Sequence, residues 1–459
     1  MIDVVGLTAS LLGDHTPDLS ALRRCGGLLH LDGVLPAVTC PAQASLLTGL
    51  GPEHHGVVAN GWLHRDTGEV RFWNQSRRLV QAEMVYDSAR RVARSQGRPF
   101  TCAKLFFWFN QGADVDFSVT PKPHYGCDGA KAFDVLIEPA ELDRRVRREL
   151  GPFPFASFWG PLAGLRSSDW ISRCAELVLT EVRPHLTLVY LPHLDYDLQR
   201  YGPSDPRTRD RATEVDGCAG RVIEAARRSG ATPVVLSEYG ITDVSRAVLP
   251  NRRLRESGWL SVRKGPFGEH IDVFGSRAFA VVDHQLAHVY VREAKDQPAV
   301  RSLLEGVEGV GRVLEGAERR QAGLDHPRAG ELVLLAREDS WFAYPYWLED
   351  SEAPDFARTV DIHRKPGYDP CELLFDPARR FPRLHVARRL LGKKLGFRNR
   401  LDVIPLDPAL IRGSHGLVTR GQESPVLLSE APSSFGASPL PMTAVRSGLL
   451  GLLGLAEGE

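Results

Sequence analysis

The feature that most constrains the fold of this chain is a recurring order of short apolar runs and helical patterns. Clear apolar runs lie at 2–7, 185–192 and 232–240, and each is bounded by turn residues. A helical pattern from 206 to 228 separates the last two. Strands that alternate with helices are typical of a parallel sheet, because each parallel connection needs a crossover. We therefore predict an α/β fold with a central, mostly parallel sheet and helices on both faces.

Further strands are predicted at 278–293, as a pair, and at 330–339. Irregular segments at 100–135 and 340–375 are rich in Pro, Gly and polar residues. The chain has 459 residues, more than the roughly 250–300 at which single cores usually stop growing. No internal repeat or long low-complexity tract divides it. We predict one large domain over 1–459, with the two irregular segments as insertions that cover the site.

The charge balance limits the classes of partner. The sequence holds 57 basic and 57 acidic residues, which predicts no nucleic-acid partner. The basic run at 385–400 is interpreted as a solvated helix face, with a local basic patch as the alternative. The apolar C-terminal stretch is too short to span a bilayer, so no stable membrane insertion is expected. Seven cysteines without CxxC spacing and the lack of a leader pattern at the start favour a cytoplasmic location.

A threonine opens the most informative segment of the sequence, "AVTCPAQASLLTG". Thr39 follows an apolar run, Pro41 suits the first turn of a helix, and Gly49 suits its end. One interpretation makes Thr39 the N-cap of that helix. The other makes it a nucleophile, because the free N–H groups and the dipole at a helix N-terminus suit a phosphoryl oxygen.

The chain resembles the nucleotide pyrophosphatase/phosphodiesterase branch of the alkaline phosphatase superfamily in segments that occur in order: "PAVTCPAQASLLTG", "HHGVVAN", "YLPHLDYDLQRYGP", "SEYG" and "GSHG". The resemblance implies an alkaline-phosphatase-like fold, two divalent metal ions and a covalent intermediate on Thr or Ser. It places the nucleophile at Thr39 and a phosphate-oxygen donor at Asn60. It also places a metal-binding carboxylate at Asp195 and a histidine ligand at His415.

Several metal ligands that the resemblance implies are replaced in this chain. Relatives end the first strand with Asp directly before Gly, where this chain has Val5, and Asp3 lies two residues earlier. The Asp-His-Gly of relatives becomes Glu238 and Tyr239 before a Gly. The histidine expected four residues after the strand-end Asp is Gln199. The usual two-zinc site therefore cannot be copied intact.

Other Asp, Glu and His residues gather at predicted strand ends and in a polar loop at 361–369, which suggests a rebuilt metal site. A mixed oxygen and nitrogen ligand set suits zinc, with manganese as the alternative, better than calcium. Single histidines in structural roles are the competing interpretation, and His193 and His288 are left unassigned. The predicted metal ligands are Asp195, Glu238, His284, His363 and His415.

Two loop-rich segments are predicted to bind the substrate. In 104–126, Asn110 and Lys122 accompany a cluster of aromatic residues, and loops often carry recognition. In "HRKPGYD", Arg364 and Lys365 could clamp a phosphate. Packing in the core is the alternative for the aromatic residues, and a solvated loop is the alternative for the basic pair.

The leading hypothesis is metal-dependent hydrolysis of a phosphodiester or nucleotide pyrophosphate bond in a small phosphorylated substrate, with Thr39 as nucleophile. A phosphonate or phosphomonoester hydrolase on the same scaffold is a second possibility. A third is a catalytically inactive relative that binds a phosphorylated metabolite. The replaced ligands favour the inactive relative, whereas Thr39 and Asn60 favour catalysis.

Overall fold

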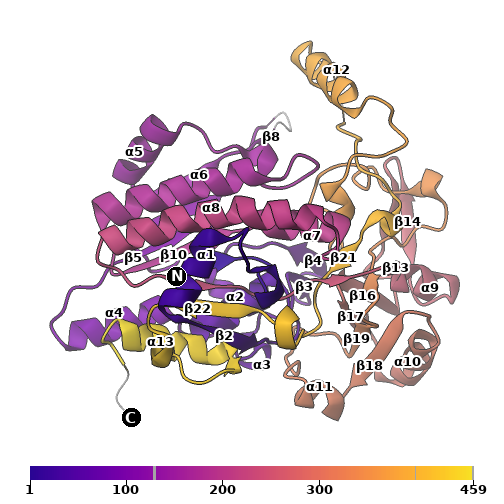
Figure 1. Cartoon of the computed structure of the whole chain (residues 1–459). Helices are drawn as coiled ribbons and strands as arrows, with labels where there is room; N and C mark the ends of the chain where they lie inside the picture. The colour runs from indigo at the N-terminus through magenta and orange to yellow at the C-terminus, as the bar shows by residue number, and fades with distance from the viewer. Residues whose placement is uncertain (128–130, 398–399, 457–459) are drawn as a thin grey trace.

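The central sheet organises the whole molecule. The structure, a computed structural model, describes residues 1–127, 131–397 and 400–456. Figure 1 shows the sheet between two layers of helices. Its nine strands lie in the order β23 (Leu440–Pro441), β2 (Gly27–Asp32), β22 (Val426–Ser429), β11 (Val234–Leu236), β1 (Ile2–Val4), β10 (Leu186–Leu191), β5 (Cys102–Leu105), β6 (Phe117–Pro121) and β9 (Val135–Glu138).

The five strands from β11 to β6 are parallel to one another, whereas β22 and β9, which flank them, run antiparallel to them. The strands β1, β10 and β11 are buried along their whole length, as their apolar sequences require. Their carboxyl ends therefore meet at one edge of the sheet. The predicted α/β fold with a mostly parallel sheet is confirmed.

Helices cover both faces of this sheet. One face carries α1 (Pro17–Cys25), α5 (Ala140–Leu150), α6 (Leu165–Leu177) and α8 (Arg207–Arg228), and the other carries α2 (Thr39–Thr48), α4 (Val85–Ser95) and α13 (Val445–Leu452) (Figure 1). The long helix α8 buries Ala212, Val215, Ala219 and Val222, a spacing that forms one apolar stripe. The shorter helices α3 (Pro52–His55) and α7 (His193–Tyr201) follow α2 and β10 along the chain.

A second, antiparallel sheet lies beside the first. Its order is β16 (Ala278–Asp283), β17 (Leu286–Val291), β19 (Leu332–Ala336) and β18 (Val310–Glu315), with α9 (Pro250–Glu256), α10 (Gln297–Glu305) and α11 (Ala317–Gln321) around it (Figure 1). It has an apolar cluster of its own. The strands predicted at 278–293 and 330–339 are thus found in this sheet, while a single domain over 1–459 stays a prediction.

Part of the segment predicted as an insertion at 100–135 belongs to the central sheet, because β5 and β6 lie within it. Phe106 and Phe107 directly after β5 are 1% and 0% exposed, so these rings pack in the core. Short pairs complete the fold: β3 (Gly61–His64) with β4 (Glu69–Phe72), β7 (His124–Tyr125) with β8 (Lys131–Ala132), β12 (Thr242–Asp243) with β21 (Gly413–Ser414), β13 (Arg246–Val248) with β20 (Ser340–Phe342), and β14 (Val262–Gly265) with β15 (Gly268–Ile271).

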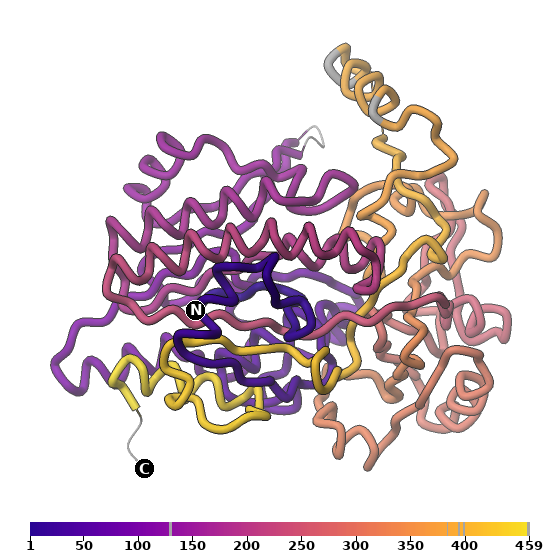
Figure 2. The backbone as a smooth tube through the Cα atoms, viewed as in Figure 1, coloured from indigo at the N-terminus to yellow at the C-terminus, as the bar shows by residue number. Residues whose placement is uncertain are grey.

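One helix stands apart from both sheets. Figure 2 shows the backbone leaving the body, forming α12 (Pro382–Lys394) and returning toward the central sheet. This excursion lies in the sequence between Tyr368 and His415, which are both site residues described below. No helix in the described part of the chain is long and apolar enough to cross a bilayer.

Candidate functional site

Thr39 lies inside the first turn of α2. The helix begins at Thr39, and Val38 occupies the cap position without a side-chain hydrogen bond. Thr39 is buried, and its Oγ1 lies 3.1 Å from the phenol oxygen of Tyr239, which follows β11. The N-cap interpretation of Thr39 is therefore wrong, because its hydroxyl contacts a residue at a strand end and not the backbone of its own helix.

Asn60 joins the N-terminus of α2 to the second sheet. Its Oδ1 accepts a hydrogen bond from the backbone N–H of Cys40 at 2.9 Å. Its own backbone N and its Nδ2 donate to the two carboxylate oxygens of Asp283, at 2.7 and 3.1 Å. Burial raises the pKa of Asp283 to about 7, while the two hydrogen bonds from Asn60 lower it. The amide of Asn60 is thus held in one orientation beside Thr39.

A buried chain of hydrogen bonds leads away from Thr39. The phenol of Tyr239 donates to Oδ1 of Asp195 at 3.4 Å. The amide of Gln199 donates to Oδ2 of Asp195 at 2.7 Å, and Tyr368 donates to Oε1 of Gln199 at 2.7 Å. Burial raises the pKa of Asp195 to about 7. Both carboxylate oxygens of Asp195 therefore have protein partners. The sequence did not predict the hydrogen bonds that Tyr239 and Tyr368 make here.

Four rings pack one against the next along this hydrogen-bonded path, and the pair of His284 and His415 is tilted by 36°. The centroid of Tyr239 lies 3.7 Å from that of His415, His415 lies 3.6 Å from His284, and His284 lies 3.8 Å from Tyr368. Burial lowers the pKa of His415 to about 3 and that of His284 well below its usual value. Both imidazoles are therefore neutral at pH 7.

The turn that carries His284 has a strained backbone. His284 has a φ of 60°, in the left-handed region that non-glycine residues seldom adopt. It lies in the tight turn between β16 and β17. Its carbonyl accepts from the N–H of Phe342 at 2.7 Å, and the next residue, Gln285, donates to the carbonyl of His415 at 2.8 Å. These contacts hold the turn of the second sheet against β20 and against the segment that follows β21.

On the other side of Tyr239, two buried carboxyl groups lie together. Nε2 of Gln43 donates to Oε1 of Glu238 at 2.6 Å, and Oε1 of Gln43 accepts from the N–H of Trp108 at 2.8 Å. Burial raises the pKa of Glu238 well above its usual value, and the charge of Asp3 raises it further. Burial also raises the pKa of Asp3 to about 7. The pair therefore keeps at least one proton at neutral pH.

The predicted metal ligands do not form one centre. Asp195, His284 and His415 lie together, but Glu238 lies with Asp3 and Gln43, and Nδ1 of His363 contacts the carbonyl of Phe72 at 3.3 Å. Among residues 1–127, 131–397 and 400–456, no group of three or more His, Cys, Asp or Glu side chains is placed to hold a metal ion.

The reason is geometric. The phenol of Tyr239 lies between Thr39 and Asp195 and contacts both, and the rings of His284 and His415 lie 3.6 Å apart at an interplanar angle of 36°. Ring nitrogens direct their lone pairs within the ring plane, so two imidazoles whose rings pack against each other do not converge readily on one ion. The residues present therefore do not fit the two-metal centre that the resemblance implies.

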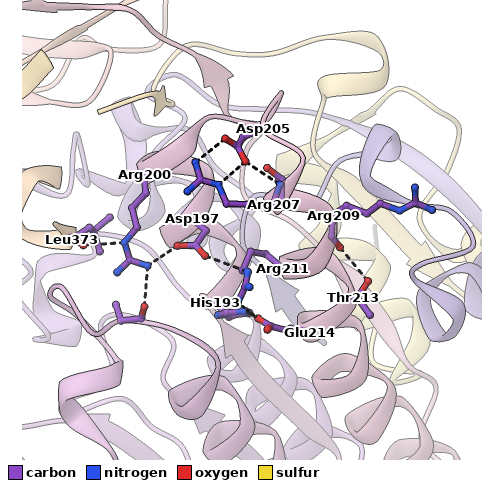
Figure 3. A network of polar contacts seen from close by, with 12 residues as sticks. His193, Asp197, Arg200, Asp205, Arg207, Arg209, Arg211, Thr213, Glu214 and Leu373 are labelled. Carbon is purple, nitrogen blue, oxygen red and sulfur yellow. Dashed lines mark hydrogen bonds and ion pairs between the residues drawn. The ribbon is translucent and has the colours of Figure 1, made fainter. Parts of the chain in front are cut away.

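An ion-pair network holds the helix that supplies Asp195 and Gln199. In Figure 3, Asp197 of α7 pairs with Arg200 at 2.6 Å, and Nε of Arg200 donates to the carbonyl of Leu373 at 2.9 Å. Nε2 of His193 pairs with Glu214 of α8 at 2.6 Å. His193, which the sequence left unassigned, thus anchors α7 to α8.

The four predicted substrate-binding residues have different surroundings. Asn110 is buried, and its Nδ2 donates to the carbonyls of Lys104 and Val119 at 3.0 and 3.2 Å. Lys122 is exposed and donates to Gln111 at 3.3 Å. Arg364 is half-exposed and pairs with Asp355 at 3.0 Å. Lys365 is buried between two carboxylates. Their roles toward a substrate stay predictions.

His288 gives a prediction about stability and pH. It is buried in β17, where its Nε2 contacts the carbonyl of Val58 at 3.0 Å. Burial lowers the pKa of His288 to about 4, although that hydrogen bond opposes the shift. Below its ordinary pKa the unfolded chain binds a proton that the folded chain does not, so acid destabilises the fold. Between pH 7 and pH 5 we expect His288 to account for a loss of about 2 kcal/mol in the free energy of unfolding.

Urea unfolding at pH 7 and pH 5 measures this loss. We expect it to be smaller in His288→Gln, whose amide can still donate to the carbonyl of Val58. His124→Gln is the control, because His124 is exposed. An identical pH dependence in His288→Gln and the wild type would contradict the assignment.

Comparison with known proteins identifies the family. Residues 1–369 match the family described as type I phosphodiesterase / nucleotide pyrophosphatase. The Saccharomyces cerevisiae ectonucleotide pyrophosphatase/phosphodiesterase 1 is 24% identical over 271 residues, which cover 53% of this chain and 34% of that protein. An uncharacterized pyrophosphatase/phosphodiesterase of Schizosaccharomyces pombe is 24% identical over 235 residues, which cover 50% of this chain and 41% of that protein. The chain spans less than half the length of these curated relatives.

Solved structures share the fold. Phosphonoacetate hydrolase from Sinorhizobium meliloti superposes with a TM-score of 0.61 at 15% identity, covering 98% of this chain and 94% of that one. Murine ectonucleotide pyrophosphatase / phosphodiesterase 5 superposes with a TM-score of 0.59 at 16% identity, covering 100% and 96%. These superpositions confirm the fold, and the match over residues 1–369 confirms the family that the sequence predicts: the chain belongs to the type I phosphodiesterase / nucleotide pyrophosphatase family.

Proposed function

We propose that this chain hydrolyses a phosphoester with Thr39 as its nucleophile. The observation that carries the proposal is the hydrogen-bonded chain from Thr39 through Tyr239 to Asp195. Because the phenol of Tyr239 donates to Asp195, its oxygen is left to accept the proton of Thr39. The hydroxyl of Thr39 is thereby oriented, and its proton has a route toward a carboxylate.

In the proposed reaction Oγ1 of Thr39 attacks phosphorus and the ester oxygen leaves with its bonding electrons. Tyr239 takes the proton of Thr39 as it passes its own proton to Asp195. Water then attacks phosphorus and the bond from phosphorus to Oγ1 of Thr39 breaks. Asp195 returns its proton through Tyr239 to Oγ1 of Thr39, and the proton that the attacking water loses passes through solvent to the released alkoxide. The N-terminus of α2 and the amide of Asn60 lie beside Thr39, where they stabilise negative charge on the phosphoryl oxygens.

Family membership favours a phosphodiester or a nucleotide pyrophosphate as the substrate. Because the fold resembles that of a phosphonoacetate hydrolase, phosphonates and phosphomonoesters are also candidate substrates to be tested. A requirement for zinc or manganese and a cytoplasmic location both stay predictions. No step above passes through a metal ion, since the donor set does not fit the two-metal centre.

Binding of a phosphorylated metabolite without turnover is the second candidate. It is favoured by Tyr239 and Gln199, which replace the histidine ligands that the resemblance implies and which hydrogen-bond to both oxygens of Asp195. It would keep the phosphate site at α2 while losing the chemistry.

Acid quenching during turnover separates the two candidates. The full chain is mixed with chromogenic phosphodiester, phosphomonoester and phosphonate substrates and then digested for peptide mass spectrometry. We expect product formation and a phosphoryl adduct on the peptide that holds Thr39, with neither in Thr39→Ala. Saturable binding of the substrate without product or adduct would overturn the hydrolase proposal in favour of the second candidate.

Metal analysis of the same preparation tests the predicted cofactor. A stoichiometric zinc or manganese ion that is lost in Asp195→Ala, together with turnover that depends on it, would contradict the metal-free proton route. Turnover in the presence of a chelator at an undiminished rate supports that route.

A further inference from the structure

The helix α12 presents an apolar face to the solvent. Leu384 and Leu391 of α12, and Leu395 directly after its end, are 67%, 59% and 67% exposed. Their spacing of seven and four residues places them on one side of a helix. A surface helix normally turns its apolar face toward the core, whereas α12 turns these leucines toward the solvent.

The opposite side of the same helix contacts the segment that returns from it and an apolar cluster of the body. Asp402 accepts from Nε2 of His385 at 2.9 Å and pairs with Arg389 at 3.2 Å. Asp402 also pairs with Arg379, which precedes the helix, at 2.8 Å. Val386 packs against an apolar cluster of the body that includes Trp341. These contacts define the inward side of the helix. The leucines lie on the opposite side and therefore face outward.

The charged residues of this excursion are almost all basic. The sequence from 379 to 400 contains nine Arg or Lys residues and no Asp or Glu, within a chain whose formal net charge is zero. Arg388 is exposed and falls on the helix between Leu384 and Leu391. Long basic side chains can extend their charged ends past neighbouring apolar groups. The outward face therefore combines leucines with positive charge.

We infer that α12 binds an anionic membrane surface, lying in the interface with its leucines toward the acyl chains. A basic helix with an apolar face is typical of such binding. Lys and Arg attract anionic headgroups, and the leucines supply apolar area that is buried. In Figures 1 and 2 the helix projects clear of both sheets, so a flat surface can reach it.

The exposed leucines favour lipid over nucleic acid, because binding to a phosphate backbone requires only the positive charge. The concentration of like charge disfavours a second copy of the chain, since two such faces would repel one another. This inference is independent of the chemistry proposed at Thr39. It concerns attachment to the membrane surface, which is distinct from insertion across the bilayer.

Cosedimentation of the full chain with vesicles tests the inference. We expect binding to vesicles of phosphatidylcholine with phosphatidylglycerol, and little binding to phosphatidylcholine alone. Leu384→Gln, Leu391→Gln and Leu395→Gln together should weaken binding to the anionic vesicles at least about tenfold. Arg388→Glu should weaken it at least about fivefold, and added salt should weaken it further.

Matched variants control for general changes of the surface. Leu50, Leu162 and Leu348 are also exposed, at 39%, 52% and 44%, and their joint replacement by Gln should leave binding unchanged. Arg148→Glu on α5 is the charge control, because its side chain is 64% exposed. Equal binding to neutral and anionic vesicles, or full binding by the α12 leucine variant, would overturn the inference. So would self-association or duplex DNA binding that α12 mediates in place of vesicle binding.

Discussion

Thr39→Val is expected to lower kcat/KM for a chromogenic phosphodiester at least about 10³-fold, because it removes the attacking oxygen and keeps the shape of the side chain. The phenol of Tyr239 loses one hydrogen-bond partner, so the free energy of unfolding should fall by only about 1 kcal/mol. Steady-state hydrolysis and urea unfolding of the same preparations separate these two effects.

The same helix provides the control for this substitution. Thr48 is buried at the other end of α2, where its Oγ1 donates to the carbonyl of Ala44 at 2.7 Å. Thr48→Val removes a hydroxyl from α2 without touching the hydrogen-bonded chain, so hydrolysis should be retained. A similar loss of activity in both variants would point to a disturbed helix and not to a lost nucleophile.

The Tyr239→Phe variant tests the role of the phenol that lies between Thr39 and Asp195. Removing the phenol oxygen breaks the route from Thr39 to Asp195 while the ring can still stack on His415. A proton-transfer group usually contributes about 10²–10⁴-fold to a rate. If Tyr239→Phe hydrolyses the diester at the rate of the wild type, the proton route proposed here is wrong, although Thr39 can remain the nucleophile.

The sequence predicted the strands of the fold well where only local pattern was needed. The apolar runs at 185–192 and 278–293 became β10 and the β16–β17 hairpin. The segment at 100–135 was harder, because strands buried on both faces lack the alternation that marks an ordinary strand, and its Pro and Gly residues suggested a loop. Its strands β5 and β6 therefore emerged only from the structure.

The sequence predicted several residue types of the site, but not the contacts between side chains from different helices and strands. The pattern around Thr39 located the segment, and the resemblance placed Asn60 and Asp195. The contact between Asn60 and Asp283 joins the N-terminus of α2 to the second sheet, and sequence spacing carries no information about such a contact. In the same way, the identity of Tyr239 suggested a lost ligand, whereas its hydrogen bonds to Thr39 and Asp195 depend on how two strand ends meet.

Arg364 and Lys365 are adjacent in the sequence but differ in burial, and this difference gives them different roles. The sequence suggested that Arg364 and Lys365 clamp a phosphate together. In the structure Nζ of Lys365 lies 2.7 Å from Asp369 and 2.6 Å from Glu372, with 2% of the residue exposed. Burial lowers the pKa of Lys365, but the two carboxylates outweigh this and raise it above its usual range. Glu372 also accepts from the indole N–H of Trp159 at 2.6 Å.

Lys365→Met is therefore expected to lower the free energy of unfolding by about 3–5 kcal/mol, because it leaves two buried carboxylates without their cation. Arg364→Met is the matched control. Its side chain is 49% exposed and its pair with Asp355 lies near the surface, so its loss should cost at most about 1 kcal/mol. Urea unfolding of both variants measures the contrast.

The same pair of variants also decides what Lys365 does for the site. The buried ion pairs hold the loop that brings Tyr368 to Gln199, so Lys365 acts on the site by positioning that loop. We expect Lys365→Met to destabilise the fold, and a Lys365→Arg variant that restores the pairing to recover part of the stability. A Lys365→Met protein of unchanged stability whose KM alone rises would instead show that Lys365 binds the phosphate directly.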